Sequence, residues 1–126
     1  MPSLGRLVVV DDDEQIVNML LQLFTRAGYQ VITMMDSTKA FSKIKGIKPD
    51  LVILDVMMPQ VDGLTICNMI KKERELADTK VIILSAKTYE ADKARALELG
   101  ADMYVEKPFE ATEFLDKVQN LLAKRI

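Results

Sequence analysis

Four short strand-like segments of this chain are each followed by side chains that could handle a phosphoryl group. The segments and the residues after them are Leu7–Val10 with Asp11 and Asp12, Leu51–Leu54 with Asp55, Val81–Leu84 with Ser85, and Met103–Glu106 with Lys107. In open parallel α/β sheets, ligands bind at the carboxyl ends of the strands. These side chains are therefore candidates for one shared site.

The side-chain types suit phosphoryl transfer assisted by a divalent cation. Three carboxylates held close together raise one another's pKa unless a positive charge compensates them. Mg²⁺ prefers oxygen ligands and commonly takes one or two carboxylates plus a phosphate oxygen, and Mn²⁺ suits the same ligands. Lys107 offers a movable positive charge and Ser85 a hydroxyl for a phosphoryl oxygen. We therefore expect a carboxylate nucleophile beside a metal ion, a cation and hydrogen-bond donors.

Composition excludes several other functions. The chain has 126 residues, is 49% hydrophobic and carries a net charge of −2. These values fit one domain over residues 1–126, with an ordered core at about 5–124, and argue against direct nucleic-acid binding by this domain. No apolar run approaches the roughly 18 residues of a membrane span. The chain lacks histidine and has one cysteine, Cys67. This excludes an internal disulfide, nearly excludes zinc and Ser–His sites, and fits a cytoplasmic protein.

Segments with helical spacing separate the strands. The expected helices run from a cap at Asp13 to Gly28, from Asp36 to Lys45 with a stop at Gly46, from Asp62 or Gly63 to about Glu75, from Thr88 to Leu99 with a stop at Gly100, and from about Glu110 to Lys124. The first should bury Ile16, Leu20, Leu23, Phe24 and Ala27, and the last Phe114, Leu115, Val118, Leu121 and Leu122. A further strand is expected at Tyr29–Met34. Such alternation predicts a parallel sheet with right-handed crossovers. The common five-strand order 2-1-3-4-5 would place Asp11 and Asp12 beside Asp55.

The chain resembles the receiver domain of bacterial response regulators over essentially its whole length. The matching residues are Val10-Asp11-Asp12, Asp55-Val56-Met57-Met58-Pro59 with Asp62-Gly63, Ser85-Ala86, Tyr104, and Lys107-Pro108-Phe109. Each motif alone is weak, but five in this order and at this spacing are highly specific. The resemblance implies a doubly wound (βα)5 fold of the flavodoxin-like, CheY-like kind.

The resemblance also implies how the acidic residues work. Asp55 would be the phosphoacceptor, which takes a phosphoryl group from the phosphohistidine of a sensor histidine kinase or a histidine phosphotransfer protein. Asp12 and Asp55 would bind Mg²⁺ directly, Asp11 through water, and Met57 through its backbone carbonyl. The domain would catalyse only its own phosphoryl transfer and dephosphorylation, and so would not be an enzyme acting on other substrates.

Ser85, Lys107 and Tyr104 complete the implied mechanism. Ser85 and Lys107 would bind the transferred phosphoryl group, and Tyr104 would turn inward when the Ser85 loop closes. This switch would change the surface formed by the helix at 88–99, the last strand and the last helix. The output would then reach a downstream effector, as a domain of the same protein or as a separate protein.

A few positions carry details of the resemblance. A cis peptide bond has a small free-energy cost only before proline. Lys107-Pro108 is therefore expected to be cis and to direct the lysine toward the site. Met35 and Ser37 stand where many relatives have Ala and Gly, which bears on packing near the second helix. Met57 and Lys87 occupy positions that tune the lifetime of the phosphoryl group in the family.

Other functions compete with the receiver interpretation. Val8–Asp13 contains the apolar–Asp-x-Asp pattern of haloacid-dehalogenase-type phosphatases, in which Asp11 would be the nucleophile and Ser85 and Lys107 the next two motifs. Those enzymes need a further acidic pair, and the acids here, from Glu110 onward, lie in a predicted helix. A flavin-binding electron carrier would need a Gly- and hydroxyl-rich loop where this chain has three acids. A degenerate receiver that only docks a partner lacks support, because every member of the constellation is present.

Several residues also have simpler interpretations. Asp13 and Asp62 are expected to be helix caps, and Cys67 an inert core thiol. Two pairs, Lys93 with Glu113 and Asp102 with Lys117, fall where receivers of winged-helix transcription regulators form intersubunit ion pairs, although Met103 replaces a usual acid there. A phosphorylation-linked homodimer follows as a hypothesis. We favour the simpler alternative, a solvated face, because exposed ion pairs contribute only about 0–1 kcal/mol.

Overall fold

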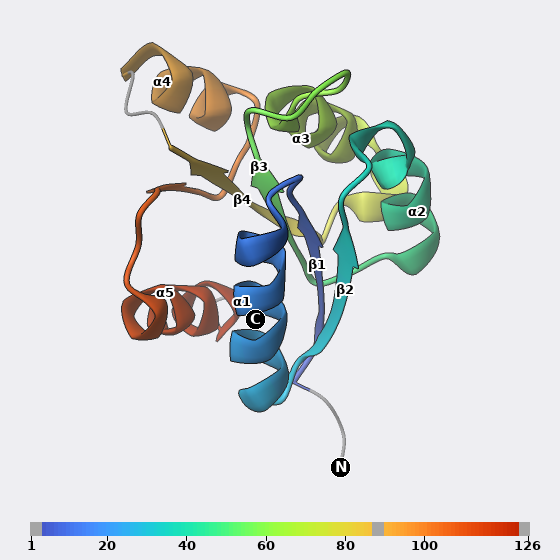
Figure 1. Ribbon diagram of the computed structural model, residues 1–126. Coiled ribbons are helices and arrows are strands. Elements are labelled where there is room, and N and C mark those ends of the chain that lie inside the picture. The colour runs from blue at the N-terminus through green and yellow to red at the C-terminus, as the bar shows by residue number, and fades with distance from the viewer. Residues whose placement is uncertain (1–3, 87–89, 124–126) are drawn as a thin grey trace.

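The computed structural model describes residues 4–86 and 90–123 and contains one five-stranded parallel sheet (Figure 1). The strands are β1 (Arg6–Val10), β2 (Gln30–Met34), β3 (Leu51–Asp55), β4 (Lys80–Ser85) and β5 (Met103–Glu106). Their order is β2-β1-β3-β4-β5, which confirms the predicted topology. Val10 pairs with Leu54 in register, so the carboxyl ends of β1 and β3 lie side by side.

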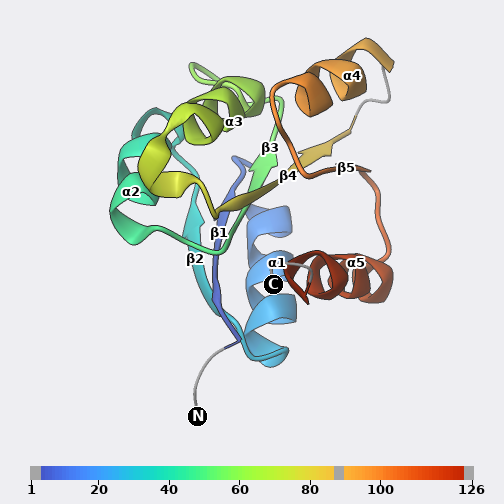
Figure 2. The same ribbon diagram turned by 180° about the vertical axis from the view of Figure 1, so that it is seen from behind.

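Helices cover both faces of the sheet (Figures 1 and 2). One face carries α1 (Glu14–Arg26) and α5 (Ala111–Ala123), and the other carries α2 (Ala40–Ile47), α3 (Gly63–Lys72) and α4 (Glu90–Glu98). The central strands are therefore buried on both sides, which explains their continuous apolar runs. Successive residues still alternate between the two cores. Leu7 and Val9 pack with α1 and α5, whereas Val8 and Val10 pack with the opposite helices.

The second helix differs from its prediction. It starts as a 3-10 turn (η1, Ser37–Lys39) capped by Asp36, and α2 then continues through Gly46 to Ile47. The predicted stop at Gly46 was wrong because the helix ends on Lys48, which has φ of 53° and donates its N–H to the Ile44 carbonyl. Pro49 follows, and a proline disfavours a right-handed helical residue before it.

Other helix ends shift by smaller amounts. α3 ends at Lys72 instead of about Glu75, because Glu73 is extended and caps a short 3-10 turn, η2 (Arg74–Leu76). Glu110 lies before α5, where its carboxylate accepts the N–H groups of Thr112 and Glu113. The predicted ends at Thr88 and Lys124 lie outside the described residues, as does Lys87.

The predicted apolar faces of the first and last helices are largely correct. Leu20, Phe24, Phe114 and Val118 are buried, together with Val17, which was not predicted. Five predicted members are only partly buried, namely Ile16, Leu23, Leu115, Leu121 and Leu122. Ala27 is also partly buried. Within the described part of the chain, no helix is both long and apolar enough to cross a membrane.

Candidate functional site

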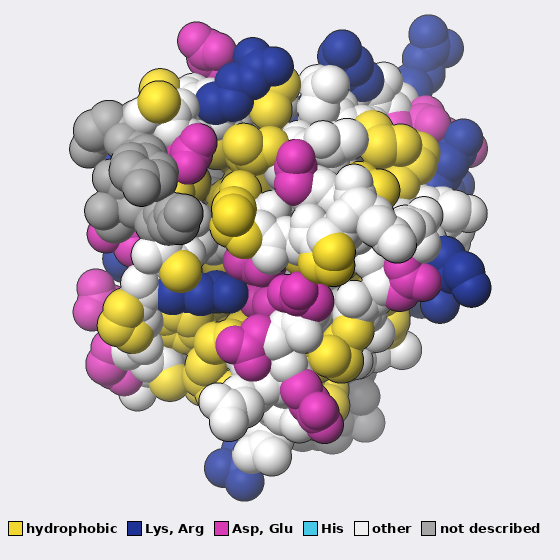
Figure 3. Space-filling view, turned by 45° about the horizontal axis from the view of Figure 1, so that its top comes forward, with side chains coloured by type: hydrophobic (Ala, Val, Ile, Leu, Met, Phe, Trp, Pro, Cys, Tyr) yellow, Lys and Arg dark blue, Asp and Glu magenta, His cyan; other side chains and the backbone are white. Residues whose placement is uncertain are grey.

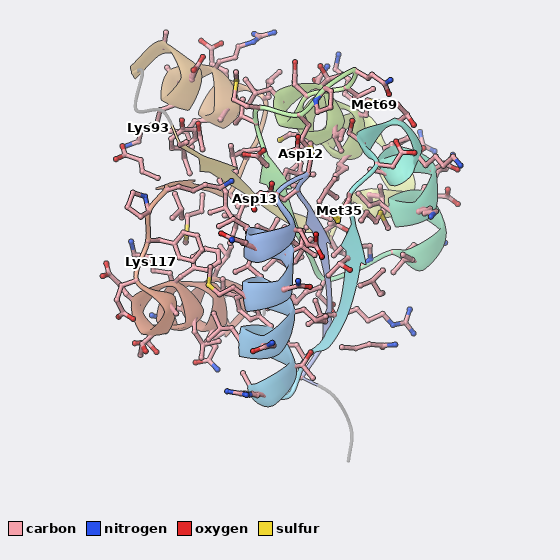
Figure 4. All side chains as sticks on the ribbon, in the orientation of Figure 1. Asp12, Asp13, Met35, Met69, Lys93 and Lys117 are labelled. Carbon is pink, nitrogen blue, oxygen red and sulfur yellow. The ribbon has the colours of Figure 1, made fainter. Side chains whose placement is uncertain are left out.

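Three carboxylates meet at the carboxyl ends of β1 and β3. Asp11 and Asp12 follow β1 directly, and Asp55 is the last residue of β3. One oxygen from each of the three side chains lies within 4.8 Å of the others. Asp11 and Asp55 are buried, whereas Asp12 is exposed. Figure 3 shows acidic side chains gathered at the centre of this face with a basic side chain beside them, and Figure 4 places Asp12 at the tip of β1.

Lys107 follows the edge strand β5 and places a positive charge beside these acids. Its Nζ lies 2.9 Å from an oxygen of Asp11 and 3.1 Å from an oxygen of Asp55. The lysine follows β5, and its N–H donates to the Ser85 carbonyl at 2.7 Å, which ties β5 to the end of β4. The Lys107–Pro108 bond is cis, as predicted. The two ion pairs therefore join residues that are 96 and 52 positions apart.

The charges of the site are only partly balanced. Burial raises the pKa of Asp55, the negative charge of Asp11 raises it further, and Lys107 opposes the rise. Burial alone would lower the pKa of Lys107, but its hydrogen bonds and charge interactions with Asp11 and Asp55 outweigh that effect and leave it raised. One ammonium group thus faces three carboxylates. The other oxygen of Asp11 accepts the Asp13 N–H at 2.9 Å, so a second cation would rely mainly on oxygens of Asp12 and Asp55.

The donor set fits a hard divalent cation. Asp11, Asp12 and Asp55 offer only oxygen atoms, and their summed negative charge exceeds the single positive charge of Lys107. Mg²⁺ and Mn²⁺ favour carboxylate, carbonyl and water oxygens. Met57, which was expected to contribute a backbone carbonyl, lies two residues beyond Asp55 and is 60% exposed. The residues present are therefore compatible with such an ion.

Ser85 and Tyr104 lie near this edge on β4 and β5. Ser85 is the last residue of β4 and is 1% exposed. Tyr104 is partly buried, pairs in register with Ile83 and packs against the core that includes Val81 and Ile83. Lys107 thus reaches the acids from the element next to Ser85. The structure gathers the acids, Ser85 and Lys107 at one edge of the sheet, with Tyr104 on the strand that leads to it.

The loop between β3 and α3 depends on a glycine whose role sequence reasoning missed. A Cβ atom on Gly63 would lie 2.1 Å from the Asp55 carbonyl oxygen, so only glycine fits the close approach. The Gly63 N–H donates to the Val56 carbonyl at 3.1 Å. Asp62 caps α3 by accepting the Thr65 N–H at 2.8 Å, as predicted. The Asp62-Gly63 pair gave a signal for a helix start but none for contact with Asp55.

A second missed cluster lies at the opposite edge of the sheet. Lys71 Nζ donates to Asp102 at 2.8 Å and to the Thr79 carbonyl at 3.1 Å. The same Asp102 oxygen accepts the Val81 N–H at 2.8 Å. Asp102 is therefore occupied within the molecule, whereas Lys117 pairs with Glu113 along α5 at 3.5 Å. The cluster connects α3, β4 and the start of β5.

The remaining predicted side chains are placed as follows. Asp13 caps α1 by accepting the Gln15 N–H at 3.0 Å, as predicted. Cys67 is buried in the core, and burial raises its pKa to about 11, as expected of an inert thiol. The acids that a haloacid-dehalogenase-type site would require after Lys107 lie at or in α5. Among them, Glu110 is occupied as the cap of that helix.

Comparisons with known proteins agree with this geometry. A family model described as "Response regulator receiver domain" matches residues 7–119. The chain is 40% identical over 119 residues to the alkaline phosphatase synthesis transcriptional regulatory protein PhoP of Bacillus subtilis, covering 94% of this chain and 49% of PhoP. It is 35% identical over 119 residues to the DNA-binding dual master transcriptional regulator RpaA of Synechocystis sp., with the same coverage of 94% and 49%.

A solved structure with a similar backbone is a response regulator receiver domain protein from Methanospirillum hungatei. Its TM-score is 0.91 at 26% identity, and the match covers 98% of this chain and 97% of that one. This chain spans about half the length (49%) of the curated relatives that it matches.

Proposed function

This chain belongs to the response regulator receiver domain family, and on that premise we propose that Asp55 is its phosphoacceptor. Phosphorylation in two-component signal transduction is the general function of the family. The observation that carries the assignment is the position of Asp55 at the end of β3, 3.1 Å from Lys107 and beside Asp11 and Asp12. Asp55 is the only one of these acids that ends the central strand of the sheet.

The proposed reaction is transfer of a phosphoryl group from a phosphohistidine. An Asp55 carboxylate oxygen attacks phosphorus, the phosphorus–nitrogen bond breaks, and the imidazole leaves with the bonding electrons. Lys107 and Ser85 hold the phosphoryl oxygens, and Lys107 offsets the charge that the acids place around them. Asp12, Asp55, the Met57 carbonyl and, through water, Asp11 would hold Mg²⁺ or Mn²⁺, which supplies further positive charge at the phosphoryl group when bound. The domain catalyses only its own phosphorylation and dephosphorylation.

The proposed partners follow from the family. The donor is a sensor histidine kinase or a histidine phosphotransfer protein in the cytoplasm, and the chain acts as one receiver domain over residues 1–126. Tyr104 and the Ser85 loop pass the change to the surface formed by α4, β5 and α5, from which an effector domain or protein receives it. PhoP and RpaA are named as transcriptional regulators, so regulation of transcription through an effector is the output that we propose.

A phosphodonor labelling experiment tests the assignment. The protein is incubated with acetyl phosphate and Mg²⁺, and bound phosphoryl is measured by intact mass spectrometry. We expect labelling of the wild type and of an Asp62→Asn control, and loss of labelling with Asp55→Asn. The phosphatase alternative makes Asp11 the nucleophile. Labelling that survives Asp55→Asn but is abolished by Asp11→Asn would overturn the proposal in favour of that alternative.

A further inference from the structure

The loop that joins β3 to α3 is held in a strained conformation. Gln60 has φ of 72°, which is unusual for a residue with a Cβ atom. Around it, the Val61 N–H donates to the Pro59 carbonyl at 2.9 Å, two residues back. A tight turn with positive φ at its centre is rare and strained, and such backbone persists only where its surroundings fix it. Another part of the protein must therefore stabilise this turn.

A buried hydroxyl supplies that support. Ser37 Oγ donates to the same Pro59 carbonyl at 2.9 Å, across 22 positions of sequence. The Ser37 residue is only 6% exposed. A hydrogen bond in such surroundings is stronger than one in water. The Pro59 carbonyl thus accepts two hydrogen bonds, one from inside the turn and one from the segment that follows β2.

Hydrogen bonds fix the segment that carries Ser37. At the end of β2, the Met34 carbonyl accepts the Asp11 N–H at 3.1 Å, which joins β2 to the acidic end of β1. Asp36 then caps η1 by accepting the Thr38 N–H. A hydrogen bond therefore joins Asp11 to the end of β2, the chain continues for three residues to Ser37, and the Ser37 hydroxyl bonds to the loop that follows Asp55.

We infer that Ser37 is a positioning residue, whose hydroxyl holds the β3–α3 loop in the shape that presents Asp55 and the Met57 carbonyl to the cation. The inference rests on the proposed function. Loops whose binding-competent form is only partly populated bind ligand more weakly in proportion to that population. Removal of the Ser37 hydroxyl should therefore weaken cation binding, although Ser37 does not touch the acids.

The chain offers a closely matched control. Thr79 Oγ1 donates to the Pro49 carbonyl at 2.8 Å, and Thr79 is 3% exposed. This is again a buried hydroxyl bound to a proline carbonyl, but it lies where β3 and β4 begin, at the edge away from the acids. Thr79→Val removes the hydroxyl with little change in shape. It should cost global stability without changing the loop after Asp55.

The experiment measures binding of MgCl₂ alone by isothermal titration calorimetry, with urea denaturation for stability and amide hydrogen exchange at Val61. We expect Ser37→Ala to weaken Mg²⁺ binding by as much as about fivefold, the scale of one lost hydrogen bond. Without metal, hydrogen exchange at the Val61 amide should be faster in Ser37→Ala than in the wild type. Ser37→Thr, which keeps the hydroxyl, should restore both, and Thr79→Val should change neither.

Two results would overturn the inference. One is wild-type Mg²⁺ binding and Val61 exchange in Ser37→Ala despite a loss of stability like that of Thr79→Val. The other is an equal loss of Mg²⁺ binding in Thr79→Val. If Ser37→Ala does not fold, the same comparison is made with Ser37→Gly. Because the wild type and Thr79→Val are also labelled with acetyl phosphate, failure of the proposed function itself would be seen separately.

Discussion

Asp55 carries an electrostatic cost that should be visible in stability. Its pKa is raised, first by burial and then by Asp11, so the folded protein holds this proton more readily than the unfolded chain does. Ionisation of Asp55 as the pH rises above the ordinary value of 3.8 therefore destabilises the fold. In EDTA at pH 7, we expect Asp55→Asn to be more stable than the wild type by on the order of 1 kcal/mol, measured by urea denaturation.

The pH dependence of that difference identifies its source. The gain should shrink as the pH falls and should vanish below the ordinary value of 3.8, where Asp55 is protonated in both states. Asp62→Asn removes an exposed carboxylate and should show no such gain. A wild type that is at least as stable as Asp55→Asn at pH 7 would mean that Lys107 fully compensates the buried charge.

The sequence identified the chemical residues well but only some of their contacts. Asp11, Asp55 and Lys107 were found because each follows a short strand, and strand ends share an edge. That Lys107 would contact both acids could not be predicted, since its side chain must reach past β4 to Asp55 and past both β4 and β3 to Asp11. Ser37 was linked only to packing, because no local pattern shows a hydroxyl that bonds a carbonyl 22 residues away.

At the level of elements, two glycines at or near helix ends should respond differently to substitution, because only one of them is required by packing. A Cβ at Gly63 would meet the Asp55 carbonyl at 2.1 Å, whereas a Cβ at Gly46 would meet nothing within 4 Å. We expect Gly63→Ala to cost about 3 kcal/mol or more, because backbone must move. Gly46→Ala lies inside α2 and should stabilise the protein by about 0.5–1 kcal/mol. Urea denaturation of both variants tests this contrast, and equal effects would contradict it.

The same two glycines show where sequence reasoning about elements stops. Both lie near polar residues at the edge of a helical pattern, so both were interpreted as helix boundaries. The stop at Gly46 failed because the end of α2 is set by Lys48 and the proline after it. The constraint at Gly63 comes from the Asp55 carbonyl at the end of β3, which lies outside the helical pattern. A sequence pattern shows where a helix is favoured, but a close approach between elements is a property of their packing.

The Lys71–Asp102 cluster should contribute more stability than the exposed Glu113–Lys117 pair on α5. Asp102 accepts hydrogen bonds from Lys71 and from the Val81 N–H, both at 2.8 Å. Its loss removes the charged partner of Lys71, which keeps only the Thr79 carbonyl, and leaves the Val81 N–H without this acceptor. We expect Asp102→Ala to cost about 2–3 kcal/mol in thermal or urea denaturation.

Glu113→Ala is the matched comparison for that prediction. Glu113 pairs with Lys117 at 3.5 Å, with side chains 66% and 49% exposed. Exposed pairs of this kind contribute at most about 1 kcal/mol. If the two variants lose the same stability, the cluster at the start of β4 and β5 does not hold these elements together.

The architecture was the most predictable part of the whole molecule. Regular alternation of strands and helices, with right-handed crossovers, leaves few possible sheets, and the order 2-1-3-4-5 proved correct. Surface relationships were less predictable, because they depend on which exposed charges already have partners within the molecule. Asp102 illustrates this. It was assigned to a hypothetical contact between subunits, but it points to Lys71 of its own chain.

That contact bears on the oligomeric state. Lys93 and Lys117 line a hollow of about 350 Å³ with Glu113 and Tyr104, and Figure 4 shows Lys93 at α4 and Lys117 at α5. A dimer through this face could form the Lys93–Glu113 pair, but Glu113 already pairs with Lys117 and Asp102 with Lys71 inside the molecule. One exposed pair contributes at most about 1 kcal/mol, too little to offset the cost of association.

We therefore expect the domain alone to remain monomeric in sedimentation velocity with Mg²⁺ and beryllofluoride. The measurement is made on the wild type, on Lys93→Glu and on Asp102→Asn. A beryllofluoride-dependent dimer that Lys93→Glu abolishes and Asp102→Asn leaves intact would contradict this expectation and assign the contact to Lys93 and Glu113. A dimer lost in Asp102→Asn would also contradict this expectation and would assign the contact to Asp102. The two variants thus show which ion pair, Lys93 with Glu113 or Asp102 with Lys117, stabilises any dimer that forms when beryllofluoride is bound at Asp55.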